Sequence, residues 1–463
     1  MNVSECNVAA IPIPHDLGSS NKIPLRTMNL ASLPPLVPVL QQLLRALGIA
    51  LLPLALAACD SGSSTGGNHS PEAPVVTPPV TEEPEPPRNT AYLDSKAGDV
   101  IKVRIEELHP TQAAIGYDQV YYKLGRWQGD LDRPTWAKDP KQQLDYLNRT
   151  IGKKFDDYCE DMGGTERAQK FLTIAEAQAA RLDQPTTYLC KDPLGSQTEN
   201  LKTVVVGWDG NLYLTDGHHT FSSLREIPDG GPKLPVWVKV SANYSDIREA
   251  SAFWERMSKE KLVWLRDGEN QTITVEQLPT RVGLASEKEA GGMQEDRYRS
   301  LVYFTRDLAY KNGKLPEYAE FLWGDWLRRQ ASGGQLPKLD EYQMAPPATP
   351  TQILAVSTLN KTLKPGGSND SYAAAVRDAA LKMTALKDTD LVFEDRDAAA
   401  LGRIVLEPDA ASDSDTKTAR DTLEELPRND VKSDGSPRGA GKLWFAVNYR
   451  NCGKPAAGTC WGW

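Results

Sequence analysis

The chain has 463 residues, of which 40% are hydrophobic and 25% are charged. This composition is ordinary for a soluble globular protein, and the length exceeds what one hydrophobic core usually organises, so we expect two or three domains. Acidic residues (62) outnumber basic residues (53), which gives a formal net charge of −9. Because duplex DNA binding relies on Lys and Arg to neutralise phosphates, this balance disfavours duplex DNA as a partner.

A short apolar run precedes Cys59. The run follows Arg45 and ends in Leu-Ala-Ala-Cys59, and it is shorter than the roughly 20 residues of a transmembrane helix. A positive flank, a short apolar core and small residues before the cut are typical of a signal peptide. The last four residues resemble a lipobox, which implies a lipid on Cys59. We therefore expect residues 1–58 to be a leader, with Met28 as a candidate true start. An ordinary signal peptide with a chance cysteine is the alternative.

Residues 59–91 are rich in Pro, Ser, Gly, Thr and Glu. This composition cannot bury apolar surface and favours an extended, semi-rigid spacer. We expect it to be a tether that holds the folded part away from a membrane, to which the lipid on Cys59 is the link. The expected location is the cell envelope, with the folded part facing the periplasm or the exterior.

Four cysteines follow the tether, namely Cys159, Cys190, Cys452 and Cys460. An even number in an exported chain predicts two disulfides. Of the three pairings that four cysteines allow, we prefer the local one, Cys159–Cys190 and Cys452–Cys460. A zinc site is the alternative, but the sequence has no Cys-x-x-Cys pair to support it.

From about residue 92 the sequence has the pattern of a folded domain. Alternating apolar residues predict strands, and apolar residues at helical spacing predict helices. An Asp-Gly pair between two short apolar runs predicts a hairpin. In chain order the predicted elements are a strand at 100–108, helices at 142–158 and 165–182, a hairpin within 201–216, a helix at 220–227, a strand at 234–240, and helices at 246–261, 296–311, 317–330 and 372–386.

Two of the five histidines stand side by side where the hairpin ends and the next helix begins. Gly217 permits a tight turn, and the helix start offers unpaired N–H groups that suit an anion. Thr220 adds a hydroxyl group, and Asp216 is a candidate to orient a histidine. His218 or His219 would then act as acid or base near neutral pH. The alternative is a polar turn whose histidines satisfy local backbone groups.

Four segments carry a resemblance to a known family. Residues 103–120, followed by the Asp-Gly-His-His turn at 216–219, resemble the ParB-like superfamily, in the branch described as ParB-like nucleases. Residues 298–306 and 321–328 resemble the end of the same module. The similarity covers about residues 95–330, which is half of the chain.

The resemblance implies an α+β fold, with a small mixed sheet and flanking helices as in the ParB and sulfiredoxin relatives. It also implies that the turn with Gly217 and the next helix cradle a nucleotide phosphate, and that Thr111 and Gln112 help to position the anion. Two departures stand out. Thr220 replaces an arginine of the relatives, and His218 lies where sulfiredoxins have a reactive cysteine, which argues against sulfiredoxin activity.

These observations predict a ParB-like α+β domain at residues 92–330, followed by an extension at 331–463 that is helical and in part disordered. The first functional hypothesis is a hydrolase or nuclease that acts on a phosphate-containing or other anionic substrate at the Asp-Gly-His-His turn. A divalent metal would suit that chemistry, although no metal ligands can be assigned. The alternatives are a non-catalytic envelope module that binds an anionic small molecule or nucleotide in the same pocket, and an effector lipoprotein that interacts through residues 331–463.

Overall fold

A computed structural model describes the folded part of the protein. The described residues are 87–129, 139–311, 313, 315–342, 371–406, 414–427 and 439–453. The predicted leader, Cys59 and nearly all of the tether lie outside them. Within these ranges, no helix is both long and apolar enough to cross a membrane.

A mixed five-stranded sheet forms one side of the domain. In the order in which they pair, its strands are β1 (Val100–Arg104), β6 (Pro235–Asn243), β4 (Lys202–Val206), β5 (Leu212–Leu214) and β2 (Leu108–Pro110). The β1–β6 and β4–β5 pairs are antiparallel, whereas β4–β6 and β2–β5 are parallel. This mixed sheet with its helices agrees with the predicted α+β class.

Two small sheets complete the strands of the described residues. They are β3 (Ala114–Ile115) with β7 (Gln294–Glu295), and β8 (Leu391–Phe393) with β9 (Arg396–Asp397). The α-helices are α1 (Tyr117–Gln128), α3 (Pro140–Arg149), α4 (Ile151–Asp161), α5 (Ile174–Ala179), α6 (His218–Glu226), α7 (Ala250–Lys259), α8 (Arg297–Thr305), α9 (Ala319–Ser332), α11 (Tyr372–Thr384), α12 (Ser414–Glu425) and α13 (Lys442–Asn451).

The hairpin predicted within 201–216 is present. Strands β4 and β5 pair with Val206 opposite Leu212, and Gly210 in the turn has a φ of 77°. A left-handed residue at this position is what an Asp-Gly hairpin turn requires. The hairpin matters for function because β5 leads directly into the turn with the two histidines.

Two predicted helices differ from the structure. The helix expected at 142–158 is broken at Thr150, whose ψ of −87° takes the backbone out of the helix and separates α3 from α4. The helix expected at 165–182 shrinks to α5, because the Arg167 guanidinium bonds Asp156 at 2.7 Å and holds the segment before α5 as a loop against α4. Neither the break at Thr150 nor the bond between Arg167 and Asp156 can be predicted from the spacing of apolar residues in the sequence.

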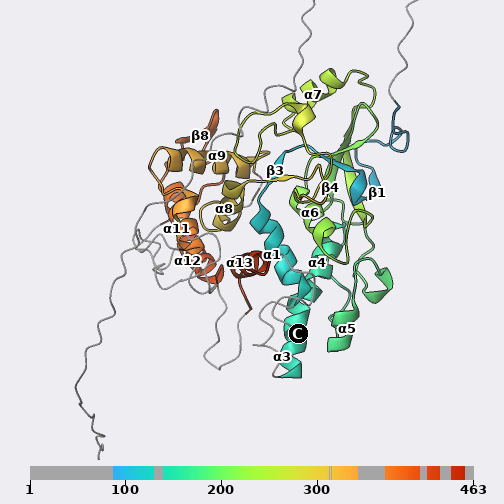
Figure 1. Ribbon diagram of the computed structural model, residues 1–463, viewed down its shortest axis with the longest axis horizontal. Coiled ribbons are helices and arrows are strands. Elements are labelled where there is room, and N and C mark those ends of the chain that lie inside the picture. Colours follow the sequence, from blue (N-terminus) through green and yellow to red (C-terminus); the bar gives the residue numbers. More distant parts are fainter. Residues whose placement is uncertain are drawn as a thin grey trace, which may run out of the picture. The chain divides into compact units, whose positions relative to one another are not determined.

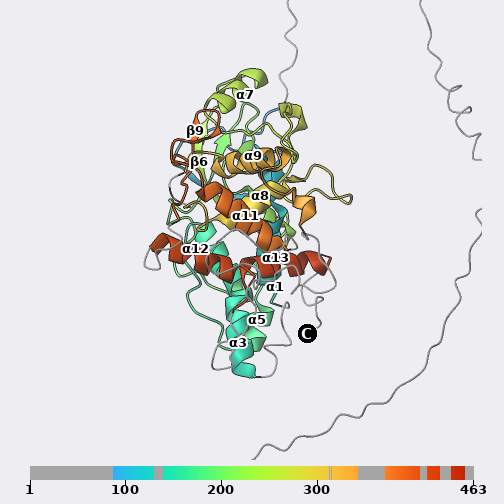
Figure 2. The same ribbon diagram turned by 90° about the vertical axis from the view of Figure 1, so that its left-hand side faces the viewer.

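Helix α1 lies at the centre of the described fold, between the sheet and the helices α8, α11 and α13 (Figure 1). Its residues Val120, Leu124 and Trp127 are fully buried. Figure 2 shows α13 crossing the fold beside α1 and below α11. The boundary expected at residue 330 stays a prediction, but α11 and α13 share one hydrophobic core with the helices before it.

One predicted disulfide is confirmed. Cys159, at the end of α4, is bonded to Cys190, and their Cα atoms are 5.5 Å apart. The bond closes the loop that contains α5 onto α4. The other predicted pair includes Cys460, which lies outside the described residues.

Candidate anion-binding site

The turn at 216–217 is shaped by a close backbone approach. Gly217 has a φ of 96°, and a Cβ atom there would lie 2.6 Å from the side chain of Lys202. Only glycine adopts this conformation readily and fits the space. Helix α6 begins at the next residue and is held by Phe221 and Leu224, which are buried in the core. The helix start is therefore fixed in place, and no side chain caps it.

Backbone N–H groups fix both histidines. The Thr111 N–H donates to Nε2 of His218 at 3.2 Å, and the Gly116 N–H donates to Nε2 of His219 at 3.1 Å. A ring nitrogen that accepts a hydrogen bond carries no proton, so a neutral imidazole in this arrangement has its proton on Nδ1. Each histidine is thereby set up as an N–H donor through Nδ1.

The surroundings keep both rings neutral. Burial lowers the pKa of His218 to about 3. Burial also lowers the pKa of His219 well below its usual value, and the nearby cation of Arg299 lowers it further. Asp216 does not bond either ring; its Oδ1 accepts the N–H of Gly217 at 2.7 Å. The backbone, rather than Asp216, thus determines the tautomers.

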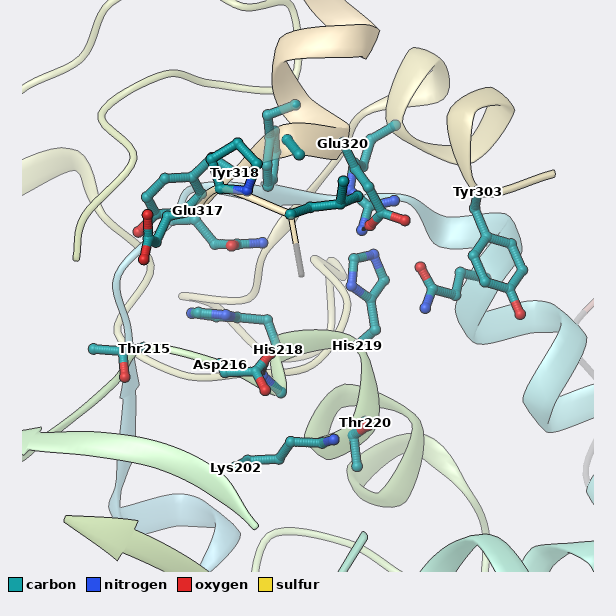
Figure 3. Close-up of a pocket in the computed structure, with 18 of the residues that line it drawn as sticks. Lys202, Thr215, Asp216, His218, His219, Thr220, Tyr303, Glu317, Tyr318 and Glu320 are labelled. Carbon is teal, nitrogen blue, oxygen red and sulfur yellow. Dashed lines mark hydrogen bonds and ion pairs between the residues drawn. The ribbon is translucent and has the colours of Figure 1, made fainter. Parts of the chain in front are cut away.

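A cavity of about 700 Å³ opens at the start of α6. Figure 3 shows His218 and His219 diverging from the helix start, with Glu317, Tyr318 and Glu320 of the opposite wall across the space. The cationic lining residues are Lys123, Lys202, Lys261, Arg299 and Arg306. The acidic lining residues are Asp216, Glu317 and Glu320. With neutral histidines, cations therefore outnumber carboxylates in a chain that is acidic as a whole.

One wall is built from a buried carboxylate held by two arginines. Glu320, in the first turn of α9, bonds the guanidinium groups of Arg299 and Arg306 and accepts the hydroxyl of Tyr310 at 2.6 Å. Burial would raise the pKa of Glu320, but Arg299 and Arg306 outweigh it and hold the pKa at about 2. Glu320 is thus a permanent anion that orients the arginines, and it is a poor proton acceptor.

The Arg299 guanidinium has donor atoms that are not used in hydrogen bonds within the described residues. Its Nη2 bonds Glu320, while Nε and Nη1 are buried and have no hydrogen-bond partner among the described residues. The residue is only 5% exposed and lines the cavity. Buried donors without partners are costly, so this guanidinium is a strong indication of an anionic ligand. Oε1 of Gln119, on the same lining, is also buried and without a partner.

Two lysines cover the other wall. Lys123 of α1 and Lys202 of β4 both form ion pairs with Asp161, at 3.6 and 3.3 Å. The Nζ of Lys123 also lies 3.5 Å from the hydroxyl oxygen of Thr220. Asp161 counters the desolvation of Lys202 and raises its pKa, so this lysine is charged at physiological pH. The cavity therefore has cations on both sides of the helix start.

The structure brings most of the predicted site residues together. The predicted residues that line the cavity are Gln112, Asp216, Gly217, His218, His219 and Thr220. Thr111 is fully buried and acts through its neighbours: its N–H bonds His218 and its hydroxyl donates to the Leu214 carbonyl. The catalytic and ligand-binding roles of these residues stay predictions. Among the described residues, no three His, Cys, Asp or Glu side chains are grouped so that they could hold a metal ion.

Sequence analysis missed the charged residues of the walls, because they come from elements far apart in the chain. The signal that could have found two of them is the seven-residue spacing of Arg299 and Arg306, inside a segment that already resembled the family. Seven residues are about two turns of a helix, so this spacing predicts that both side chains lie on one face, although in the structure Arg306 is the residue that follows α8.

Comparison with known proteins supports the family resemblance. Residues 101–329 match the model of a family described as "Putative ParB-like nuclease", which confirms the resemblance predicted for about residues 95–330. No curated protein matches the chain. Among solved structures, the chain is similar to protein Atu1540 from Agrobacterium tumefaciens, with 18% identity over 62% of this chain and 91% of that one and a TM-score of 0.33.

The neutral state of His218 predicts a pH dependence of stability. The unfolded imidazole takes up a proton near pH 6.5, whereas the folded one stays neutral down to about pH 3. Stability is therefore complete above pH 6.5 and falls as the pH drops from 6.5 toward 3. Between pH 7 and pH 5, His218 accounts for a loss of about 2 kcal/mol in the free energy of unfolding.

The variant His218→Gln should lose about 2 kcal/mol less than the wild type over this range, because a glutamine can accept the Thr111 N–H but does not titrate. Urea unfolding of both proteins at pH 7 and pH 5 measures the difference. Equal losses in the two proteins would show that His218 is protonated in the folded state.

Proposed function

We propose that the ParB-like domain matched at residues 101–329 binds a phosphate-bearing anion in the cavity at the start of α6. The observation that carries this proposal is the buried Arg299, whose Nε and Nη1 have no partner among the described residues. These two nitrogens point in different directions, and each can donate to an oxygen of a phosphate or carboxylate.

Other features of the cavity support an anion of moderate size. The uncapped N-terminus of α6 offers backbone N–H groups and the positive end of the helix dipole. Nδ1 of His219 adds a neutral donor that does not depend on pH in the physiological range. A volume of about 700 Å³ lies within the range of small-molecule sites and exceeds what a lone phosphate would fill.

Replacing Arg299 tests the proposal. Arg299→Lys keeps a cation beside Glu320 but loses the Nε and Nη1 donors, so affinity for the ligand should fall by roughly 10- to 100-fold. Calorimetry with inorganic phosphate, nucleotides and sugar phosphates measures this loss. Arg297→Gln is the matched control, because Arg297 is on the same helix but pairs with the exposed Asp340 and does not line the cavity. Wild-type protein that binds no member of the panel would refute the proposal.

Hydrolysis of a phosphate ester is the second candidate, favoured by the family match. A catalytic role for the histidines fits best as donation from Nδ1 to charge that develops on a phosphoryl oxygen, together with Arg299. A general base at Nε2 fits less well, because the Thr111 and Gly116 N–H groups already occupy both Nε2 atoms. A non-catalytic binding module would use the same cavity without this step.

Removal of one such donor typically lowers a rate by roughly 100- to 1000-fold. We therefore expect His219→Ala to lower hydrolysis of bis(p-nitrophenyl) phosphate by about that factor, in assays with magnesium and with chelator. His109→Gln is the control, since His109 packs beside Tyr213 and does not line the cavity. Equal rates for the wild type and His219→Ala would exclude catalysis by this site, and ligand binding without hydrolysis would identify a binding module.

We also propose that the protein is a lipoprotein of the cell envelope, anchored through Cys59. The support is the sequence alone, with its signal-like segment and tether, since Cys59 lies outside the described residues. The disulfide between Cys159 and Cys190 is compatible with an oxidising compartment.

Labelling of cells with a palmitate analogue tests the anchor. The wild-type chain should incorporate the label and sediment with membranes, whereas Cys59→Ser should do neither, because the serine hydroxyl cannot replace the thiol that is acylated. Cys6→Ser is the control, as Cys6 lies far upstream of the lipobox-like segment. Label retained in Cys59→Ser would refute the assignment.

A further inference from the structure

The last described helix, α13, packs along α1 although it lies more than 100 residues beyond the family match at 101–329. Leu443, Phe445, Ala446 and Val447 are buried in this contact and the surrounding core. The helix thus covers α1, whose residues Gln119 and Lys123 line the cavity on its other side. This arrangement raises the question of what α13 contributes to the site.

A partly buried ionic cluster joins the two helices. Arg450 of α13 forms ion pairs with Asp118 of α1 at 2.6 Å and with Glu295 of β7 at 2.9 Å. The Tyr372 hydroxyl of α11 donates to the other oxygen of Asp118 at 2.7 Å. Asp118 is only 3% exposed. This carboxylate in the first turn of α1 therefore depends on two side chains from the C-terminal helices, and leaving it unpaired would be strongly destabilising.

The two residues that contact Arg450 lie close in sequence to residues that build the two walls of the cavity. On the α1 side, Asp118 lies between Gly116, whose N–H bonds His219, and Gln119, which lines the cavity. The N–H of Asp118 also donates to the Ser300 hydroxyl on α8 at 3.2 Å. The fit between these elements is tight, because a Cβ atom on Gly116 would lie 2.8 Å from the backbone nitrogen of Ser300.

On the β7 side, Glu295 is followed directly by Asp296, which caps α8. Asp296 accepts the N–H of Arg299 at 2.9 Å and thereby orients the first turn of α8, from which the Arg299 guanidinium reaches the cavity. Both groups that contact Arg450 are thus one or two residues from a group that orients a donor of the cavity.

We propose that Arg450 is a positioning residue of the anion site, which holds the α1 wall through Asp118 and the β7–α8 wall through Glu295. The proposal rests on the anion-binding function inferred above. In this proposal, the C-terminal helices help to hold the binding site in shape. Residues 101–329, which match the family, would form an incomplete site without them.

The test compares three changes in the full-length protein. The double variant Asp118→Asn/Arg450→Met removes the buried carboxylate together with its cation, and leaves only the partly exposed Glu295 without its ion pair. Tyr372→Phe removes one hydroxyl hydrogen bond from Asp118 with little change in volume. The control pair is Lys154→Met/Asp229→Asn, which removes a buried ion pair of 2.5 Å that lies outside the cavity lining.

We expect the double variant to weaken binding of inorganic phosphate about tenfold, and Tyr372→Phe to weaken it about threefold. The control pair should lose stability without losing affinity, as measured by urea unfolding and calorimetry. Arg450→Lys, which keeps the charge but not the guanidinium Nη2 that contacts both Asp118 and Glu295, should lie between wild type and double variant. Wild-type affinity in a folded double variant or in Tyr372→Phe would overturn the proposal.

A second readout needs no ligand. The Gly116 amide and the His219 ring nitrogens report the hydrogen bond between them in nitrogen-15 NMR spectra, and both signals should shift in the double variant and in Tyr372→Phe but stay in place in the control pair. Unchanged signals would overturn the positioning role. If wild-type protein binds no phosphate while these signals shift, the anion-binding function fails and the positioning role stands.

Discussion

Two backbone N–H groups that donate to neighbouring imidazoles constrain the whole site. Thr111 and Gly116 belong to the segment that links β2 with α1, whereas His218 and His219 begin α6. Their hydrogen bonds join segments about 100 residues apart and remove Nε2 from the chemistry of both rings. The histidines can then offer only their Nδ1 N–H groups to the cavity, which favours binding and stabilisation of an anion over proton abstraction.

Four of the five cations that line the cavity share two carboxylates. Glu320 holds Arg299 and Arg306, and Asp161 holds Lys123 and Lys202. Such pairing limits the cost of keeping cations in a partly buried space and preorganises them. The guanidinium of Arg299 still has two donors free, so the pairing does not consume the capacity to bind.

The sequence was informative where the structure depends on neighbouring residues. The Asp-Gly hairpin and the glycine turn follow from local chemistry and are where they were expected, whereas α6 begins at His218, two residues before the expected start. The break of a predicted helix at Thr150 and the walls built by Arg299 and Lys202 were not predictable. They depend on contacts between distant segments, for which a single sequence carries no period or motif. Asp216 is a further example. Because it is close in sequence to the histidines, we expected it to orient one of their rings, but it bonds the Gly217 N–H, and backbone N–H groups bond the rings instead.

The sharing of Asp118 among α1, α11 and α13 also bears on the unit that folds. A chain cut after residue 329 would remove both Arg450 and Tyr372, together with the helix that packs along α1. Asp118 would lose its ion pair, and the apolar residues of α1 that α13 covers would face water. The interactions that stabilise α1 therefore extend beyond residue 329, where the family match ends.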